Sequence, residues 1–268
     1  KYYADLNVKM AQFELTLLDW AEAHKGARKY VAFADKCWPA FPSQFGFEPC
    51  YVNSRLVSRG IPVSCEVDIY GALSEYIGLC ISNDAVTLLD INNSVPQYIY
   101  DEDIKGKSDY KLTDTFMGFH CGNTPACKMC DSRAVKYQLI QHRLLEPAGS
   151  EPDFTRGTLE GDIAASDITF YRLQCNSEGE LVSYVAEGEV LDVPTRSFGG
   201  IGIFAIKEMG RFYRHVLVEK NYPHHGAVVF GHFGKPLFEV FKMLGVEVDE
   251  IGYNQPKGVR YPTENPWG

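Results

Sequence analysis

The sequence predicts an α/β region followed by a mostly-β region: the end of a parallel α/β sheet domain, then an antiparallel, barrel-like domain. In the first third of the 268 residues, strand-like and helix-like apolar runs alternate with short connections, as in parallel sheets with crossover helices. Between about 95 and 205, short alternating or β-branched runs are broken by Gly, Asp and Asn, which is typical of antiparallel sheets. We therefore expect a Rossmann-like α/β part over 1–82 and a β domain over 83–268.

Each predicted element follows from its local pattern. Apolar residues recur at helical spacing over 3–24, and Gly60 closes a helical stretch that begins at 49. Pro236 and Gly245 bracket a late helix over 235–244. The predicted strands of the first third are 30–38, 61–66 and 85–91, with a helix over 68–81 between the last two. The predicted strand runs of the β region include 98–104, 158–173 and 180–193.

Composition narrows the class of protein. The net charge of −9 and the pI of about 5.3 argue against nucleic acid or an anionic membrane as partner. No apolar run reaches the length of a membrane span, and the first residues do not form a signal peptide. The eight cysteines are too sparse for a disulfide scaffold, so we expect mostly reduced thiols in a cytoplasmic protein. The chain begins without Met inside a helical pattern, and we expect it to be part of a longer polypeptide.

Two carboxylates stand near the ends of neighbouring predicted strands. Glu66 closes the strand 61–66 and Asp90 lies near the end of the strand 85–91. If these strands are parallel neighbours, both side chains reach the carboxyl edge of one sheet, where α/β sheets bind ligands. Oxygen ligands suit Mg²⁺ or Mn²⁺. The alternative is that both are helix N-caps or surface residues, and Asp68 is the better N-cap candidate.

Histidines and cysteines supply further candidate ligands. His224, His225 and His232 lie within eleven residues, and a neutral imidazole could complete a site begun by two carboxylates. Taken alone, such histidines are more often solvated or bonded to the backbone. The segment 119–130 offers His120 and three cysteines, Cys121, Cys127 and Cys130. This set is compatible with zinc, but no second spaced pair follows it. A redox pair formed by Cys127 and Cys130 is less supported, because no thioredoxin-like context surrounds it.

Four motifs together resemble a known family. The segments CEVDIYGALS, LLDINN, FHCGN and YPHHGAVVFGHFGK are similar to those of the L-fucose isomerase family and, more distantly, to those of L-arabinose isomerases. The resemblance runs over nearly the whole chain, in the same order. The resemblance implies that the chain matches only the later part of a family polypeptide, without the family's first, Rossmann-like domain and starting inside the second.

The resemblance implies a set of site residues. In the family a divalent metal, usually Mn²⁺, is held by residues that match Glu66, Asp90 and His225. His120 falls where L-arabinose isomerases carry a metal-binding histidine, and we expect it to face the substrate or to serve as an occasional ligand. His224 stands where the better-known L-fucose isomerases have Asn, at a position that touches substrate. The sugar preference is therefore open.

The implied activity is aldose–ketose isomerisation of the L-fucose/D-arabinose or L-arabinose type. It proceeds through an enediol, with Glu66 and Asp90 exchanging protons beside the metal. Trp38 could stack on a sugar face or equally belong to the core. Family members are hexamers in which a neighbour's first domain walls the cleft, so this chain alone is expected to be inactive or weak. The alternatives are a metal-dependent hydrolase with the same ligands and a non-catalytic sugar-binding module.

Overall fold

A computed structural model describes residues 2–37, 39–136, 157–246 and 251–254. The α-helices are α1 (Tyr2–His24), α2 (Ala40–Phe45), α3 (Cys50–Ser58), α4 (Ile69–Ser82), α5 (Gln97–Ile99), α7 (Met209–Tyr213) and α8 (Gly234–Met243). Helical turns of the 3₁₀ and π types are η1 (Tyr100–Ile104), η2 (Leu112–Asp114), η3 (Ala126–Lys128) and η4 (Arg214–Glu219). The described part of the chain contains no helix that is both long and apolar enough to cross a membrane.

The strands fall into two sheets. The first is a parallel ladder of β1 (Phe33–Ala34) and β2 (Val63–Ser64). The second has the order β11-β8-β7-β10-β3-β4-β9-β6-β5. Its strands are β3 (Val86–Asn93), β4 (Thr115–His120), β5 (Ala134–Lys136), β6 (Thr158–Asp162), β7 (Ser166–Cys175), β8 (Leu181–Val190), β9 (Gly200–Ala205), β10 (His225–Phe230) and β11 (Ile251–Asn254).

Six strands of the large sheet close into an antiparallel barrel. Each neighbour in the series β8-β7-β10-β3-β4-β9 pairs antiparallel. The circle is completed because β8 also pairs with β9, with Glu189 opposite Ala205 and Val190 opposite Phe204. Closure satisfies the strand edges that an open sheet would leave unpaired. The prediction of a barrel-like antiparallel region is thus confirmed for these strands.

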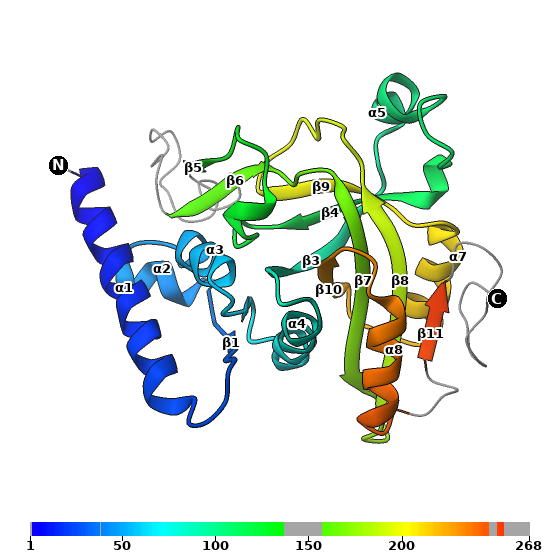
Figure 1. The fold of residues 1–268 in the computed structure, drawn as a ribbon. Coiled ribbons are helices and arrows are strands. Elements are labelled where there is room, and N and C mark those ends of the chain that lie inside the picture. The colour runs from blue at the N-terminus through cyan, green and yellow to red at the C-terminus, as the bar shows by residue number, and fades with distance from the viewer. Residues whose placement is uncertain (1, 38, 137–156, 247–250, 255–268) are drawn as a thin grey trace.

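Helices cover the outside of the barrel, while aromatic and aliphatic side chains fill its centre. One buried cluster includes Phe116, Phe170, Tyr184 and Phe204, and ring contacts such as Phe116 with Phe204 at 5.3 Å connect the strands across it. Residues of α4 and α8 pack on β7 and β10 in a second cluster. Figure 1 shows α1, α2 and α3 gathered to one side, next to the β1 ladder, with α4 between them and the barrel.

The predicted pairing of the strands around 61–66 and 85–91 is wrong. The first of them, shortened to β2, pairs with β1 and not with β3. β3 instead lies between β4 and β10 and is antiparallel to both. Helix α4 therefore does not return the chain to the same sheet but carries it from the parallel ladder to the barrel. The apolar runs were identified correctly, but an apolar run does not specify its partner.

Two other expectations can be compared with the structure. Residues 98–104 were expected to be strand-like and are helical instead, in α5 and η1. Ile99 and Ile104 of this segment are buried against β4 and β9, so its apolar side chains follow a helical spacing. The helices expected over 3–24, 49–60, 68–81 and 235–244 are present as α1, α3, α4 and α8. The Pro-rich tail beyond 254 lies outside the described residues.

Candidate active site

Asp90 and His225 face each other across two antiparallel strands. Asp90 of β3 is the register partner of His225, the first residue of β10. Opposed residues of an antiparallel pair project to the same side of the sheet, so their side chains meet. His225 Nε2 lies 3.1 Å from Asp90 Oδ1, and the two side chains are exposed at only 8 % and 18 %. This cross-strand pair is the centre of the candidate site.

His120 completes a group of three at the end of β4, the other neighbour of β3. One ligand atom from each of Asp90, His120 and His225 can be chosen so that all three lie within 4.8 Å of one another. His120 Nδ1 accepts a hydrogen bond of 2.9 Å from the backbone N–H of Cys121. That bond fixes the imidazole so that the Nε2 side turns to the other two residues. Three neighbouring barrel strands thus deliver one side chain each to one point.

Glu66 reaches the same point from a turn rather than from the barrel. Its carboxylate Oε2 lies 3.7 Å from His225 Nε2, and its side chain is 57 % exposed. Glu66 and Val67 have φ angles of 63° and 58°, a left-handed conformation that is rare for Glu and an outlier for a β-branched residue. Such residues cost roughly 1–3 kcal/mol each and persist where neighbouring structure holds them. The backbone N–H of Val67 donates to Asp35 O at 2.8 Å, and this hydrogen bond helps to hold the turn in its left-handed conformation.

Asp68 orients His225 from behind. Its Oδ2 lies 2.9 Å from His225 Nδ1, and it receives two hydrogen bonds, of 2.5 and 2.8 Å, from the guanidinium of the buried Arg172. Asp68 also caps α4, as expected, by accepting from the N–H of Gly71 at 2.8 Å. A Cβ at position 71 would lie 2.6 Å from Asp68 Oδ2, so only glycine leaves room for this carboxylate. Asp68 therefore ties the imidazole to both a helix terminus and a barrel strand.

Carboxylates and imidazoles of the centre shift one another's pKa values. Burial would lower the pKa of His225, but the contacts with Asp68 and Asp90 outweigh burial and raise it to about 9. Burial would raise the pKa of Asp90, yet its interactions with His225 and His120 leave it below the ordinary value. The pKa of His120 is lowered, first by burial. The centre thus favours an ionised Asp90 with a positive group beside it.

Three buried atoms of this centre, Asp90 Oδ1, His120 Nε2 and His225 Nε2, have no well-directed hydrogen bond from the described residues. Asp90 Oδ1 and His225 Nε2 lie 3.1 Å apart. Buried polar atoms are normally satisfied, and these three point to a shared missing partner. One carboxylate and two imidazoles are a donor set that divalent transition metals accept. The contact between Asp68 and His225 Nδ1 is the outer bond that metal-ligating histidines usually make. The residues present therefore fit a divalent metal, which Asp90 and His225 would hold together with Glu66, His120 or both.

Glu75 lies behind the same centre on α4 and is fully buried. Its carboxyl group accepts a hydrogen bond from the hydroxyl of Ser64. Burial raises the pKa of Glu75 to about 8, helped by the negative charge of Asp68 and opposed by the bond from Ser64. Sequence reasoning missed both Glu75 and the contacts that Asp68 makes with His225 and Arg172. The E-x-D spacing of 66–68 was the one available signal.

The other site residues predicted from the sequence lie at different distances from the centre. His224 Nε2 lies 3.7 Å from Asp90 Oδ1 and is 59 % exposed, at the rim of the centre. His232 lies elsewhere, with Nε2 3.3 Å from the carbonyl of Gly188. Trp38 lies outside the described residues.

The zinc and redox interpretations of the segment 119–130 find no support in the geometry. In the described ranges, His120 forms its group with Asp90 and His225, and Cys121, Cys127 and Cys130 belong to no converging group of metal-ligating side chains. None of these three cysteines is in a disulfide. The adjacency of four donor residues in sequence therefore does not place them around one ion.

Fold and site together define a class: a closed antiparallel barrel protein with a candidate metal centre at its strand ends. Residues 118–252 match the family described as "L-fucose isomerase, C-terminal domain". The chain belongs to this family. The matched span includes His120 and His225 and begins after Glu66 and Asp90.

Curated relatives extend the similarity over most of the chain. A sulfoquinovose isomerase of Alkalicoccus urumqiensis is 26 % identical over 252 residues, covering 89 % of this chain and 49 % of that protein. The sulfoquinovose isomerase of Priestia aryabhattai is 26 % identical over 243 residues, covering 89 % of this chain and 47 % of its own length. That of Clostridium sp. (strain MSTE9) is 24 % identical over 226 residues, covering 81 % and 43 %. The chain spans about half the length of the curated relatives it matches.

Proposed function

We propose that the protein containing this chain is a metal-dependent aldose–ketose isomerase that works through an enediol. The observation that carries the proposal is the convergence of Asp90, His120 and His225, with the Glu66 carboxylate 3.7 Å from His225. Aldose–ketose isomerisation moves one hydrogen from C2 to C1 and a second from the C2 hydroxyl to the C1 oxygen. The reaction therefore needs no external oxidant. It requires a carboxylate near both carbons and a positive group beside the developing oxyanion.

The bound cation, proposed as Mn²⁺, supplies Lewis-acid stabilisation of negative charge on the sugar oxygens. Asp90 and His225 are the proposed fixed ligands, because they are buried and are held by strand pairing. Glu66 is the proposed third ligand. As the most exposed of the three, it is also the carboxylate we assign to carrying the proton between C2 and C1 of the open-chain sugar.

Asp90 has the second proton-transfer role as an ionised carboxylate at neutral pH, since its pKa is lowered. His224 stands at the rim of the centre and contacts substrate in this proposal, and His120 faces the substrate or serves as an occasional metal ligand. We further propose that the whole protein is a cytoplasmic hexamer in which a neighbouring copy walls the cleft. This chain alone then turns over sugar slowly.

The relatives' names add a candidate substrate. We add sulfoquinovose to the candidate substrates L-fucose, D-arabinose and L-arabinose. Three relatives that align with most of this chain are named sulfoquinovose isomerases. All four are aldoses that a C1–C2 isomerase converts to ketoses. The reaction type is therefore the same for each of them.

The test is an incubation of these four sugars with the protein, Mn²⁺ and heavy water. The expected result is ketose formation with deuterium at the carbon next to the carbonyl, an exchange that also detects slow turnover. Glu66→Gln is expected to abolish both signals, whereas Glu178→Gln, at an exposed turn between β7 and β8, leaves them unchanged. Hydrolysis products, or sugar binding that survives Glu66→Gln without deuterium uptake, would overturn the proposal.

A further inference from the structure

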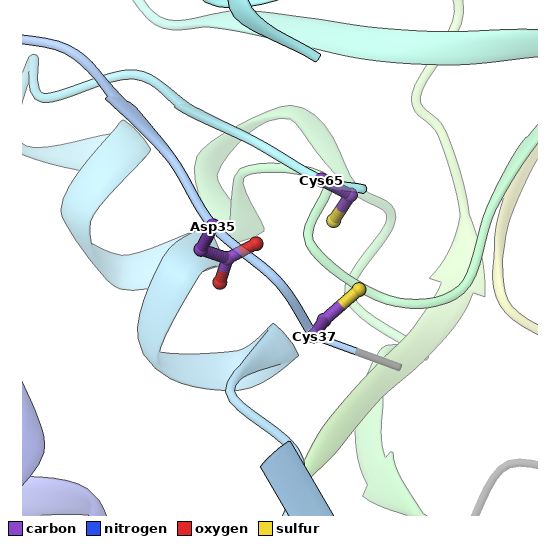
Figure 2. Close-up of side chains that lie close together, drawn as sticks. All are labelled: Asp35, Cys37 and Cys65. Atoms are coloured by element: carbon purple, nitrogen blue, oxygen red, sulfur yellow. The ribbon is translucent and has the colours of Figure 1, made fainter. Parts of the chain in front are cut away.

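A second group of metal-ligating side chains lies at the end of the parallel ladder, separate from the candidate active site. It consists of Asp35, Cys37 and Cys65, from each of which one ligand atom lies within 4.8 Å of the other two. Figure 2 shows the two sulfur atoms and the carboxylate pointing into the same space. We call these three residues the thiol cluster. None of them enters the proposed isomerase chemistry.

The ladder itself creates this convergence. Phe33 pairs with Val63 and Ala34 with Ser64, so Asp35 and Cys65 are the next residues of two parallel strands. They leave the ladder side by side, and the N–H of Asp35 still donates to Ser64 O at 2.9 Å. Cys37 follows two residues after Asp35 and lies close enough for the two thiols to interact directly. The backbone pairing of β1 with β2 therefore brings these residues together independently of side-chain contacts.

The Asp35 carboxylate has an unfilled position. Its Oδ2 accepts a hydrogen bond of 2.6 Å from the amide of the fully buried Asn53 on α3. Its Oδ1 is buried and has no hydrogen-bond partner among the described residues. Cys65 is fully buried and Cys37 is only 9 % exposed. A buried carboxylate oxygen that faces two thiols and is oriented from behind by an amide is the arrangement of a ligand with its outer support.

From this geometry we propose that Asp35, Cys37 and Cys65 bind a thiophilic divalent cation of the zinc type. Two thiolates and one carboxylate make a donor set that selects Zn²⁺ over the oxygen-preferring Mg²⁺ and Mn²⁺. Zinc bonds of about 2.0–2.3 Å bring ligand atoms to within roughly 4 Å of one another, a small contraction of the separation seen here. Three protein ligands leave a fourth position for water. Binding releases the thiol protons to solvent as the two sulfur–metal bonds form.

The cluster adjoins the strained turn of the active site. Cys65 precedes Glu66 in the chain, and Asp35 O accepts the N–H of Val67. A cation bound at the cluster joins Cys65, before this turn, to Asp35, whose carbonyl accepts from Val67. It thereby helps to hold the left-handed Glu66 and Val67 in place. The cation site stands on its own geometry, and only its effect on Glu66 rests on the proposed isomerase function.

The test is a Co²⁺ titration of the reduced, metal-free protein, followed by absorption in the near ultraviolet, where thiolate-to-cobalt charge transfer appears. We expect one saturable charge-transfer band that Zn²⁺ displaces. Cys37→Ser and Cys65→Ser each remove the band, and Asp35→Asn weakens Co²⁺ binding at least tenfold. Cys127→Ser, an exposed cysteine outside the cluster, leaves the band unchanged. His225→Asn also leaves it unchanged, which separates this site from the candidate active site.

A second measurement uses the unsubstituted chain, so it does not depend on the folding of any variant. Zn²⁺ is expected to protect Cys37 and Cys65 from alkylation while Cys127 reacts at the same rate with and without metal. Absence of a thiolate band, a band that survives both serine substitutions, or unprotected Cys37 and Cys65 would overturn the proposal. So would a protein whose two thiols form a disulfide and take up no metal after reduction. Sugar isomerisation is not measured in either experiment, so failure here leaves the proposed function standing.

Discussion

The molecule has two candidate cation centres that differ in how they are built. The barrel centre draws Asp90, His120 and His225 from three paired strands and offers one oxygen and two nitrogens. The thiol cluster draws its residues from the ends of a two-residue ladder and offers two sulfurs and one oxygen. The difference in donors predicts different metals. Turn residues 66 and 67 connect the two centres, so one strained segment responds to both.

The largest expected effect separates the two centres by their ligands. His225→Asn or Asp90→Asn should lower Mn²⁺ affinity by more than 100-fold, since loss of a direct ligand exceeds the roughly 10–100-fold cost of losing an outer partner. Electron paramagnetic resonance of free Mn²⁺ measures the affinity. Cys65→Ser serves as the comparison and should change Mn²⁺ affinity far less. Equal losses for His225→Asn and Cys65→Ser would mean that the two groups form one site.

The next effect concerns the residue behind the barrel centre. Asp68→Asn keeps a good N-cap for α4 but removes the negative charge that pairs with Arg172 and His225. We expect a loss of about 10–100-fold in Mn²⁺ affinity, with Co²⁺ binding at the thiol cluster unchanged. Asp84→Asn, beyond the other end of α4, is the matched control. If Asp68→Asn binds Mn²⁺ as tightly as the unsubstituted protein, then Asp68 is a helix cap and no more.

The smallest effect, taken per pH unit, is a pH dependence of stability that comes from Glu75. Its pKa rises from 4.5 to about 8 on folding, so between these values the folded state holds a proton that the unfolded state has lost. The free energy of unfolding should then fall by about 1.4 kcal/mol per pH unit across this window. The stabilisation is complete below pH 4.5 and lost above about pH 8. Glu75→Gln should remove this slope, and Glu22→Gln on α1 should not.

Denaturant melts at several pH values measure that slope. Glu75 lies between the two centres. It accepts a hydrogen bond from Ser64 of the parallel ladder and lies close to the charges of Asp68 and His225. A slope that persists in Glu75→Gln would assign the pH dependence to another buried group.

The sequence predicted the residues of the barrel centre better than the path that brings them together. Helix α4 was predicted from its apolar spacing and its Asp68 cap, because both signals are local. The partner of β3 could not be predicted, since a buried apolar run is compatible with parallel and antiparallel neighbours. Asp90 meets His225 through a cross-strand register that no local pattern encodes. The two residues were linked at the sequence level only by the resemblance of their motifs to those of a family.

Other residues show why parts of the site were missed. Cys37 and Cys65 were counted among the mostly reduced thiols and were not linked to each other, and 28 residues separate them in the sequence. Only the pairing of β1 with β2 makes them neighbours. Arg172 lies inside a strand, where its approach to Asp68 depends on the packing of α4 against β7. Contacts of this kind depend on tertiary structure and leave no periodic trace in the sequence.

The position of His225 in β10, the last of the six barrel strands in chain order, has a consequence for biosynthesis. While the polypeptide is being made, β3 and β4 leave the ribosome long before β10, and until then the seam between β3 and β7 stays open. If the centre binds a metal as proposed, a nascent chain that stops short of residue 225 lacks one of its ligands. Metal capture would mark the moment at which the last barrel strand inserts, and would make the ion a reporter of completed folding.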